Sequence, residues 1–394
     1  MYYVGIDVSK CHHDAIGIDA TGEVILAAFR FANTRQGVDH LVSQLQSLSA
    51  QVSIAIEATG HYWLPLYEAL IAAGYTVSVF NPFQIKAFRQ TGLRKTKTDA
   101  VDSRWIADFL RLGCAKPMVV PSPASRQMRE LARLRFTLLQ RQSDICRRAL
   151  TILDRVFPEY HTLFSRSFSP TSRALLRRAV TADAFADWPL DDLVLTLRQA
   201  SRGHFGVDKA HQILRLARTS LGIRSLASVA HQEMQLALDQ LALLDDQVAT
   251  LDRKLARLLE QTGTFLTTIP GISTILAATI LGEIGDIHRF DALKQLVAFA
   301  GLDPSVHQSG QFQGAHAHLS KRGSVYLRRA LWLATSVARQ YDPDLKAFYQ
   351  RKRRQHKHHS VVMGAVCHRL LARIYVVLKE HRPYEIRTPA ESTA

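Results

Sequence analysis

The chain has 394 residues, enough for two or three domains that each bury a core, and 47% of its residues are hydrophobic, which argues against wholesale disorder. Its 50 Lys and Arg residues exceed its 34 Asp and Glu residues, so the formal charge of +16 favours a polyanionic partner such as DNA or RNA. The four cysteines form no CxxC pair, which argues against a disulfide framework or a structural zinc site.

No signal-peptide pattern opens the chain, and no stretch of eighteen uncharged apolar residues occurs in it. We therefore expect a soluble protein of the bacterial cytoplasm, associated with the nucleoid.

Residues 1–115 alternate between strand-like and helix-like patterns. Three successive strands suit antiparallel hairpins, and the later alternation of helices and strands suits parallel crossovers. That order predicts an α/β domain with an RNase H-like (RuvC-like) fold. The predicted elements are strands at Tyr2–Ile6, His13–Asp19 and Glu23–Phe31, a helix capped by Thr34, a strand at Val52–Ile56, a helix from about His61 to Ala73, and a strand at Tyr75–Phe80 followed by a helix.

Beyond a proline-punctuated stretch near residue 120, the chain is mostly helical. Two segments keep a 3–4 residue apolar spacing, which is typical of a helical seam, either within one chain or between subunits. Residues 160–230 have weak periodicity and support no prediction. We predict an all-α coiled-coil connector at 116–260 and a helical domain at 261–394. The seam positions are Leu131, Leu134, Leu138 and Ile145, and then Leu241, Leu244, Val248, Leu251, Leu255 and Leu258.

Four acidic residues stand where predicted elements begin or end. Asp7 follows the first strand and Glu57 ends the fourth, so parallel pairing of these strands places the two carboxylates side by side. Asp99 and Asp102 are three residues apart, which puts both on one face of a helix. Converging carboxylates repel unless a hard divalent cation joins them, and two Mg²⁺ ions held in this way activate phosphodiester chemistry.

Each acid taken alone has a simpler explanation. An Asp after a strand is usually a turn residue, and Asp99 near a helix start favours the helix dipole. The same opening also suits a sugar-kinase-type ATPase, but that fold needs later glycine-rich phosphate loops, which the sequence lacks. The four acids together, in an RNase H-like order, favour the metal site.

A glycine-rich segment near residue 310 contains a candidate nucleophile. Ser309 precedes Gly310, and a serine in such a loop can approach a phosphorus atom closely. Ser-Gly is also a common turn dipeptide, and composition alone makes Ser305, Ser320 and Ser324 equal candidates. His307 is a weak candidate for a base. The cations expected to contact phosphate here are Lys321, Arg322, Arg328 and Arg329.

Two further features suggest nucleic-acid contacts. The run Arg351, Lys352, Arg353 and Arg354 suits a DNA or RNA backbone, with a solvated loop as the alternative. Pro270-Gly271 opens a helix and resembles one half of a helix-hairpin-helix, with a simple packing turn as the alternative.

Together these motifs resemble the DEDD transposases of bacterial insertion sequences (the IS110 group) and the related Piv-type DNA invertases. The matches occur in order at both ends of the chain, whereas residues 150–230 carry none. The matching segments are Tyr3-Val4-Gly5-Ile6-Asp7, Ile56-Glu57-Ala58-Thr59-Gly60, Lys97-Thr98-Asp99-Ala100-Val101-Asp102, Ile269-Pro270-Gly271-Ile272, Phe299-Ala300-Gly301-Leu302, Ser309-Gly310, Ser320-Lys321-Arg322-Gly323 and Leu327-Arg328-Arg329-Ala330-Leu331.

The resemblance implies a specific chemistry. Asp7, Glu57, Asp99 and Asp102 match the Mg²⁺ ligands of the family's RuvC-like domain, and Ser309 matches a serine that becomes covalently linked to a DNA phosphate. It also implies tetramers in which the serine domain of one subunit completes the carboxylate site of another, and a non-coding bridge RNA that pairs donor and target DNA. His316-Ala317-His318 stands where a more basic stretch is expected.

Two other functions remain open from the sequence. A RuvC-like nuclease that uses water and two metal ions needs the carboxylates and leaves Ser309 without a role. A non-catalytic nucleic-acid scaffold descended from such an enzyme has no need of four converging acids.

Overall fold

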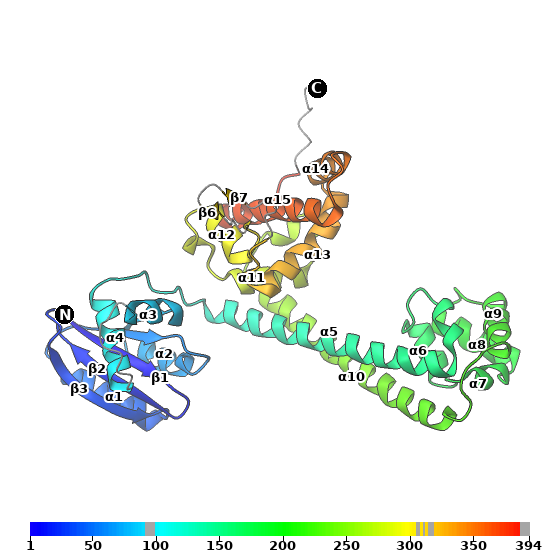
Figure 1. The fold of residues 1–394 in the computed structure, drawn as a ribbon, viewed down its shortest axis with the longest axis horizontal. Coiled ribbons are helices and arrows are strands. Elements are labelled where there is room, and N and C mark those ends of the chain that lie inside the picture. The colour runs from blue at the N-terminus through cyan, green and yellow to red at the C-terminus, as the bar shows by residue number, and fades with distance from the viewer. Residues whose placement is uncertain (91–98, 305–307, 310–311, 314–318, 387–394) are drawn as a thin grey trace, which may run out of the picture. The chain divides into compact units, whose positions relative to one another are not determined.

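The computed structural model describes residues 1–90, 99–304, 308–309, 312–313 and 319–386, with the backbone alone for residues 99–100, 308–309 and 312–313. The chain separates into two compact units, Met1–Pro121 and Ser122–Ala394 (Figure 1). Each unit has its own buried cores. The predicted division into three parts at 1–115, 116–260 and 261–394 stays a prediction.

The first unit contains a five-stranded mixed sheet with the strand order β3-β2-β1-β4-β5. β1 pairs antiparallel with β2 and parallel with β4, β2 pairs antiparallel with β3, and β4 pairs parallel with β5. These directions are those predicted for an RNase H-like sheet. The strands are β1 (Tyr2–Val8), β2 (His12–Ile18), β3 (Val24–Ala32), β4 (Val52–Glu57) and β5 (Thr76–Phe80).

Helices connect and cover this sheet (Figure 1). Thr34 caps the first helix as predicted, because its side chain accepts a hydrogen bond from the Gly37 amide at 3.2 Å. Leu41, Leu66 and Leu70 are buried and pack against the apolar strand residues in one core. The helices are α1 (Arg35–Gln46), α2 (Trp63–Ala72), α3 (Pro82–Arg89) and α4 (Asp99–Arg111).

Two 34-residue helices, α5 (Pro123–Val156) and α10 (Ala227–Glu260), pack against each other in the second unit. Leu138, Leu244 and Leu251 form a buried cluster between them, which makes the predicted seam an intramolecular one. Leu134 does not belong to this seam, because it is 49% exposed. Ion pairs such as Arg155–Glu233 add to the apolar contacts between the basic α5 and the acidic α10.

A small helical lobe lies between α5 and α10 in the chain. Its core contains Tyr160, Phe185 and Trp188, and burial raises the pKa of Tyr160. The lobe's helices have 5 to 12 residues, too short for a clear periodic pattern in the sequence. After the 3-10 turn Pro158–Thr162 they are α6 (Pro170–Leu176), α7 (Ala182–Ala186), α8 (Leu190–Ser201) and α9 (Val207–Arg218).

The remaining helices pack on the N-terminal half of α5 around a further core. The last helix is long and apolar enough to cross a membrane by composition, but eight of its residues are buried, and seven of these, including Val366, Cys367 and Leu370, belong to this core. The helices are α11 (Thr274–Ile284), α12 (Leu293–Ala300), α13 (Val325–Tyr341), α14 (Pro343–Arg354) and α15 (His359–Glu380), with 3-10 turns at Leu266–Thr268 and Ile287–Arg289 and the short strands β6 (Gln308–Ser309) and β7 (Phe312–Gln313).

The predicted Pro-Gly turn packs against α13. Gly271 has φ +92°, and a Cβ there would lie 2.6 Å from the Ala334 oxygen and 2.6 Å from the Ala338 nitrogen. Only glycine combines this conformation with so close an approach. Of the two interpretations of this motif, the contact therefore favours a packing turn over half of a helix-hairpin-helix.

Candidate active site

The absence of a side chain at Gly5 brings α4 directly onto β1. A Cβ at this position would lie 2.1 Å from the Ser103 oxygen and 2.4 Å from the Ala107 nitrogen. Asp102 immediately precedes Ser103 and is only 8% exposed. The close packing therefore places a buried carboxylate at the sheet face that α4 covers.

Asp7 and Glu57 lie on neighbouring parallel strands. Ile6 is in register with Ile56, so each acid occupies the next position of its strand. Asp7 lies two residues beyond Gly5 and faces the same side of the sheet, because side chains alternate along a strand. The predicted neighbourhood of the two acids is thus present, although Asp7 lies within β1, which continues to Val8, rather than after its end.

The guanidinium group of Arg89, the last residue of α3, joins two of the predicted carboxylates. Its Nη2 lies 3.3 Å from Glu57 Oε2, and its Nη1 lies 3.2 Å from Asp102 Oδ2. Thr59 adds a hydrogen bond from its hydroxyl to Glu57 Oε1 at 3.1 Å. Glu57 and Asp102, 45 positions apart in sequence, therefore belong to one cluster.

The electrostatics of this cluster call for a cation. Burial raises the pKa of Glu57 above its ordinary value, and the Asp102 carboxylate raises it further, although Arg89 and the Thr59 hydroxyl act in the opposite direction. Half-buried carboxylates that repel each other are stabilised by a positive charge placed between them. Arg89 supplies that charge in this structure.

The donor set is of the type that holds a hard divalent metal ion. Carboxylate oxygens are the ligands that Mg²⁺ prefers, and the arginine between two of them shows that the pair accepts a cation. Within the described residues, no three His, Cys, Asp or Glu side chains form a ready metal-binding group. Asp99 begins α4, and its side chain lies outside the described part.

The sequence analysis gave no role to Arg89, Thr59 or Asp14, although Thr59 stands in the matching segment Ile56-Glu57-Ala58-Thr59-Gly60. Asp14 is in register with Asp7 across β1 and β2, and both of its oxygens face Arg30, at 3.1 and 3.2 Å. Register could have identified Asp14, since hairpin pairing was predicted. No sequence pattern identifies Arg89, because its role depends on how α3 and α4 pack.

Ser309 lies on a short antiparallel hairpin of β6 and β7, in register with Phe312. Pro304 and Leu319, which flank the segment that contains this hairpin, form a bridge, and the Ser320 hydroxyl donates to Asp303 Oδ1 at 2.5 Å. The base of the segment is therefore fixed by backbone and side-chain bonds. The side chain of Ser309, and the residues Ser305, His307, Gly310, Gly314 and His316-Ala317-His318, lie outside the described part.

Two of the other candidate serines have structural partners. Ser324 caps α13 by accepting a hydrogen bond from the Leu327 amide at 3.1 Å, and its hydroxyl donates to Glu283 Oε2 at 2.8 Å. Ser320 is bound to Asp303 as described above. Their hydroxyl groups are thus occupied in holding the protein chain.

The predicted phosphate-contacting cations near the hairpin differ in accessibility. Lys321 and Arg322 are exposed in the turn that precedes α13. Arg328 donates to the Ala300 oxygen at 3.1 Å, and the exposed Arg329 stacks over the Phe136 ring at 4.7 Å. Lys321 and Arg322 are therefore the freer pair for an external anion, within the residues whose contacts are described.

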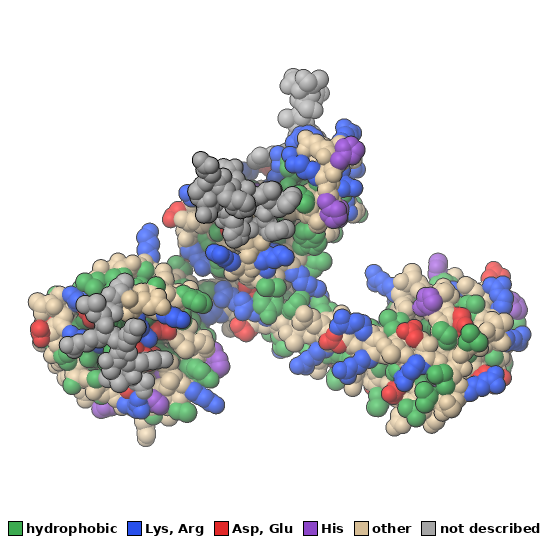
Figure 2. Space-filling model, viewed as in Figure 1, with side chains coloured by type: hydrophobic (Ala, Val, Ile, Leu, Met, Phe, Trp, Pro, Cys, Tyr) green, Lys and Arg blue, Asp and Glu red, His purple; other side chains and the backbone are tan. Residues whose placement is uncertain are grey.

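The second basic run forms the last turn of α14. Blue side chains gather over this helix in Figure 2, with purple histidines beside them. Arg351, Arg353 and Arg354 are exposed and Lys352 is half-buried, and cations at this position also favour the C-terminal end of the helix dipole. The run is thus a solvent-facing basic surface on a helix, so the alternative of a solvated loop is wrong.

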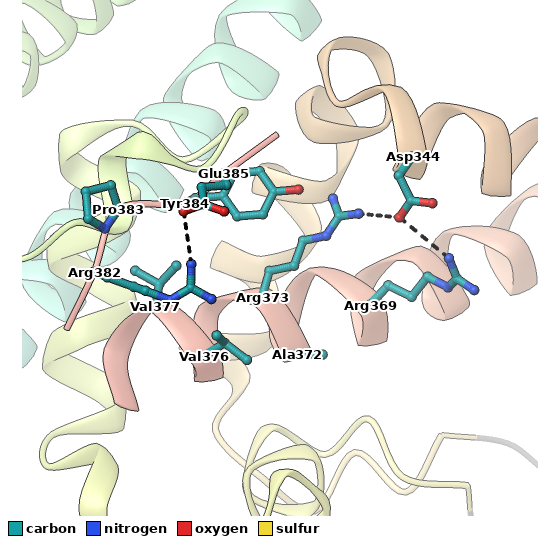
Figure 3. Close-up of a pocket in the computed structure, with 10 residues that line it drawn as sticks. All are labelled: Asp344, Arg369, Ala372, Arg373, Val376, Val377, Arg382, Pro383, Tyr384 and Glu385. Atoms are coloured by element: carbon teal, nitrogen blue, oxygen red, sulfur yellow. Dashed lines mark hydrogen bonds and ion pairs between the residues drawn. The ribbon is translucent and has the colours of Figure 1, made fainter. Parts of the chain in front are cut away.

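A cavity of about 240 Å³ lies beside α15 and is lined by Arg369, Arg373, Arg382 and Tyr384 among others (Figure 3). Its arginines already have acidic partners: Asp344 pairs with Arg373 at 2.5 Å and with Arg369 at 3.7 Å, and Arg382 pairs with Glu385 at 3.5 Å. Because these charges compensate one another, we do not assign an anion to this cavity.

Comparison with known proteins gives matches at both ends of the chain. A DEDD transposase family model (IS110) matches residues 4–158, and a model described as "Transposase IS116/IS110/IS902 family" matches residues 263–350. The chain is 26% identical to the pilin gene-inverting protein of Moraxella bovis over 98% of both chains. It is 42% identical to the transposase for insertion sequence element IS1111A of Coxiella burnetii over 64 residues, which are 16% of this chain and 17% of that protein.

Among solved structures, RuvC of Thermus thermophilus in complex with a Holliday junction substrate matches 30% of this chain and 99% of its own, with 16% identity and a TM-score of 0.23.

Proposed function

Because the chain belongs to the IS110 family of insertion-sequence transposases, enzymes that break and rejoin DNA strands, we propose that it recombines DNA through a phosphoserine intermediate. The observation that carries the carboxylate half of this proposal is the meeting of Glu57 and Asp102 at one guanidinium, beside the strand that bears Asp7. In the proposal Asp7, Glu57, Asp99 and Asp102 hold Mg²⁺, which polarises the scissile phosphate when bound.

The proposed role of the serine is to conserve the energy of the phosphodiester bond. The Ser309 oxygen forms a bond to phosphorus as the bond to one sugar oxygen breaks, and the serine proton passes to the departing oxygen. Attack by a new sugar hydroxyl reverses these changes and reseals the strand without ATP. The Pro304–Leu319 bridge and the Ser320–Asp303 hydrogen bond, which hold the residues that flank the segment containing Ser309, support this role, because a nucleophile must be held in position.

The proposal extends to the binding partners. Lys321, Arg322, Arg328, Arg329 and the α14 run Arg351, Lys352, Arg353 and Arg354 contact the backbone of donor or target DNA, or of a bridge RNA. The exposure of most of these side chains supports such contacts. The chain acts in the bacterial cytoplasm, at the nucleoid, as a dimer or tetramer.

The test is a search for a covalent protein–DNA adduct at Ser309. The full-length protein is incubated with Mg²⁺, the ends of its own element and RNA transcribed from the flanking region, and products are examined on denaturing gels and by mass spectrometry. We expect an adduct that Ser309→Ala and Asp7→Ala both abolish, whereas Ser320→Ala, which keeps the nucleophile but loses the hydrogen bond to Asp303, should only reduce it. Free cleaved ends with Ser309→Ala still active would establish the hydrolytic nuclease instead. DNA binding without any cleavage would establish the scaffold.

A further inference from the structure

We propose that Arg89 is the internal cation of the carboxylate site: it holds Glu57 and Asp102 together in the metal-free protein and is exchanged for a divalent metal ion. This inference rests on the proposed metal-binding role of these acids. Arg89 lies at the end of α3, outside every motif that the family resemblance rests on.

The geometry is that of a shared counter-ion. One guanidinium reaches both acids through different nitrogens, at 3.3 Å to Glu57 and 3.2 Å to Asp102. All three side chains are largely shielded from water, with exposures of 24%, 14% and 11% for Arg89, Glu57 and Asp102. Shielding strengthens the attraction and also makes an unpaired charge at this position costly. A cation between the two acids therefore stabilises the ionised pair.

The attachment of Arg89 is suited to exchange. In the described part of the chain its buried Nε has no hydrogen-bond partner, so the two carboxylates are the partners that hold the guanidinium. Arg89 contacts one oxygen of each carboxylate, Glu57 Oε2 and Asp102 Oδ2, so a divalent ion that takes these two oxygens replaces the guanidinium. The side chain is long and flexible, so it can turn away without movement of α3.

If Arg89 is exchanged for a metal ion, it stabilises the metal-free protein and at the same time lowers the affinity of the site for metal. A protein whose binding-competent form is only partly populated binds its ligand more weakly by that fraction. Removing Arg89 therefore makes the acids available and tightens metal binding, while the metal-free protein loses the charge that stabilises its acidic cluster. If Arg89 had only a structural role, its removal would weaken metal binding, because loss of local order weakens any site built on it.

The experiment measures Mn²⁺ binding to the full-length protein by electron paramagnetic resonance and its melting temperature with EDTA or saturating Mn²⁺. We expect Arg89→Ala to bind Mn²⁺ about tenfold more tightly than the wild type. In EDTA its melting temperature should fall by about 3 °C or more, and Mn²⁺ should restore most of this loss. Arg89→Lys keeps the charge but cannot form the two-pronged contact. Its Mn²⁺ affinity and its melting temperature in EDTA should therefore lie between those of the wild type and of Arg89→Ala.

Two further variants separate the possible failures. Arg104→Ala removes another partly exposed arginine of the same unit, paired with Asp108 at 3.8 Å, and should leave Mn²⁺ affinity unchanged. Asp102→Asn should weaken Mn²⁺ binding at least tenfold, and a wild-type affinity here would overturn the proposed metal site itself. If Asp102→Asn loses the metal while Arg89→Ala binds it no more tightly, the site stands and the exchange is wrong.

Discussion

Arg133 and Glu283, 150 positions apart, form a two-pronged ion pair that ties α5 to α11. The distances from Arg133 Nε and Nη2 to the two Glu283 oxygens are 2.7 and 3.0 Å. Glu283 is 1% exposed and also accepts a hydrogen bond from Ser324, the cap of α13. One buried carboxylate therefore joins three helices next to the turn that contains Lys321 and Arg322.

Replacing this carboxylate by an amide should weaken the second unit. Glu283→Gln keeps the shape of the side chain but leaves Arg133 opposite a neutral group, and we expect the melting temperature to fall by about 5 °C. The matched control is Asp144→Asn, which breaks an ion pair with Arg147 whose side chains are 75% and 56% exposed. That change should shift the melting temperature by less than about 1 °C, because exposed pairs contribute little. Equal shifts in a calorimeter would contradict the role of Glu283.

The buried imidazole of His13 predicts a pH dependence of stability. Burial lowers the pKa of His13, whose ring contacts Phe31 and whose Nε2 lacks a described partner. The unfolded chain takes up a proton below about pH 6.5, whereas the folded protein does so only at lower pH. The unfolded state thus binds more protons as the pH falls, and stability decreases from about pH 7 toward the lower folded pKa.

His13→Leu should remove this part of the pH dependence. We expect the plot of melting temperature against pH to become flatter between about pH 5 and 7 than in the wild type. The exposed His61 offers a control, since His61→Leu removes a histidine from the same unit without removing a buried one. A wild-type slope in His13→Leu would mean that other groups cause the dependence.

The Pro-Gly turn before α11 allows the cost of a steric clash to be separated from the cost of backbone strain. Gly271→Ala introduces both a strained φ of +92° and a Cβ 2.6 Å from backbone atoms of Ala334 and Ala338, so we expect a loss of about 3 kcal/mol or more. Gly263→Ala shares the strain, with φ +60°, but its Cβ meets nothing within 4 Å, and should cost about 1 kcal/mol. Similar losses in thermal unfolding would show that contact with α13 is unimportant.

The sequence predicted those features that follow from local pattern and strand direction. The neighbourhood of Asp7 and Glu57 followed from parallel pairing, and the capping role of Thr34 from residue type. Exposed Leu134 was misplaced in the seam, because periodicity alone does not say where two long helices stop facing each other. Whether the seam joined one chain or two was left open, and the structure shows the intramolecular pairing.

Contacts between distant segments were the part that the sequence did not reveal. Arg89 joins Glu57 to Asp102 only because α3 and α4 come together over the sheet, and Arg133 meets Glu283 across 150 residues. Neither arginine stands out among the 50 basic residues of the chain. Such ion pairs depend on tertiary packing, which leaves no periodic trace in the sequence.

The carboxylate cluster finally predicts which acids the reaction requires. Asp7→Asn preserves the shape of a side chain within β1 but removes a proposed metal ligand, so we expect strand cleavage to fall at least about a hundredfold. Asp14 is the matched control, because it lies directly across from Asp7 on β2 but has both oxygens engaged by Arg30. Asp14→Asn should retain cleavage within about tenfold.

Single-turnover cleavage of labelled element-end DNA in Mg²⁺ distinguishes the two acids. Equal losses in Asp7→Asn and Asp14→Asn would mean that the site responds to any missing negative charge on this face of the sheet rather than to a specific ligand. Full activity of Asp7→Asn would show that Asp7 is not a ligand of the metal ion. The inference that parallel register brings Asp7 and Glu57 to one metal ion would then be wrong. Loss in Asp7→Asn alone fits a site in which Arg30 and Arg89 divide the neighbouring carboxylates: Asp14 stays with its arginine, and Glu57 and Asp102 exchange theirs for metal.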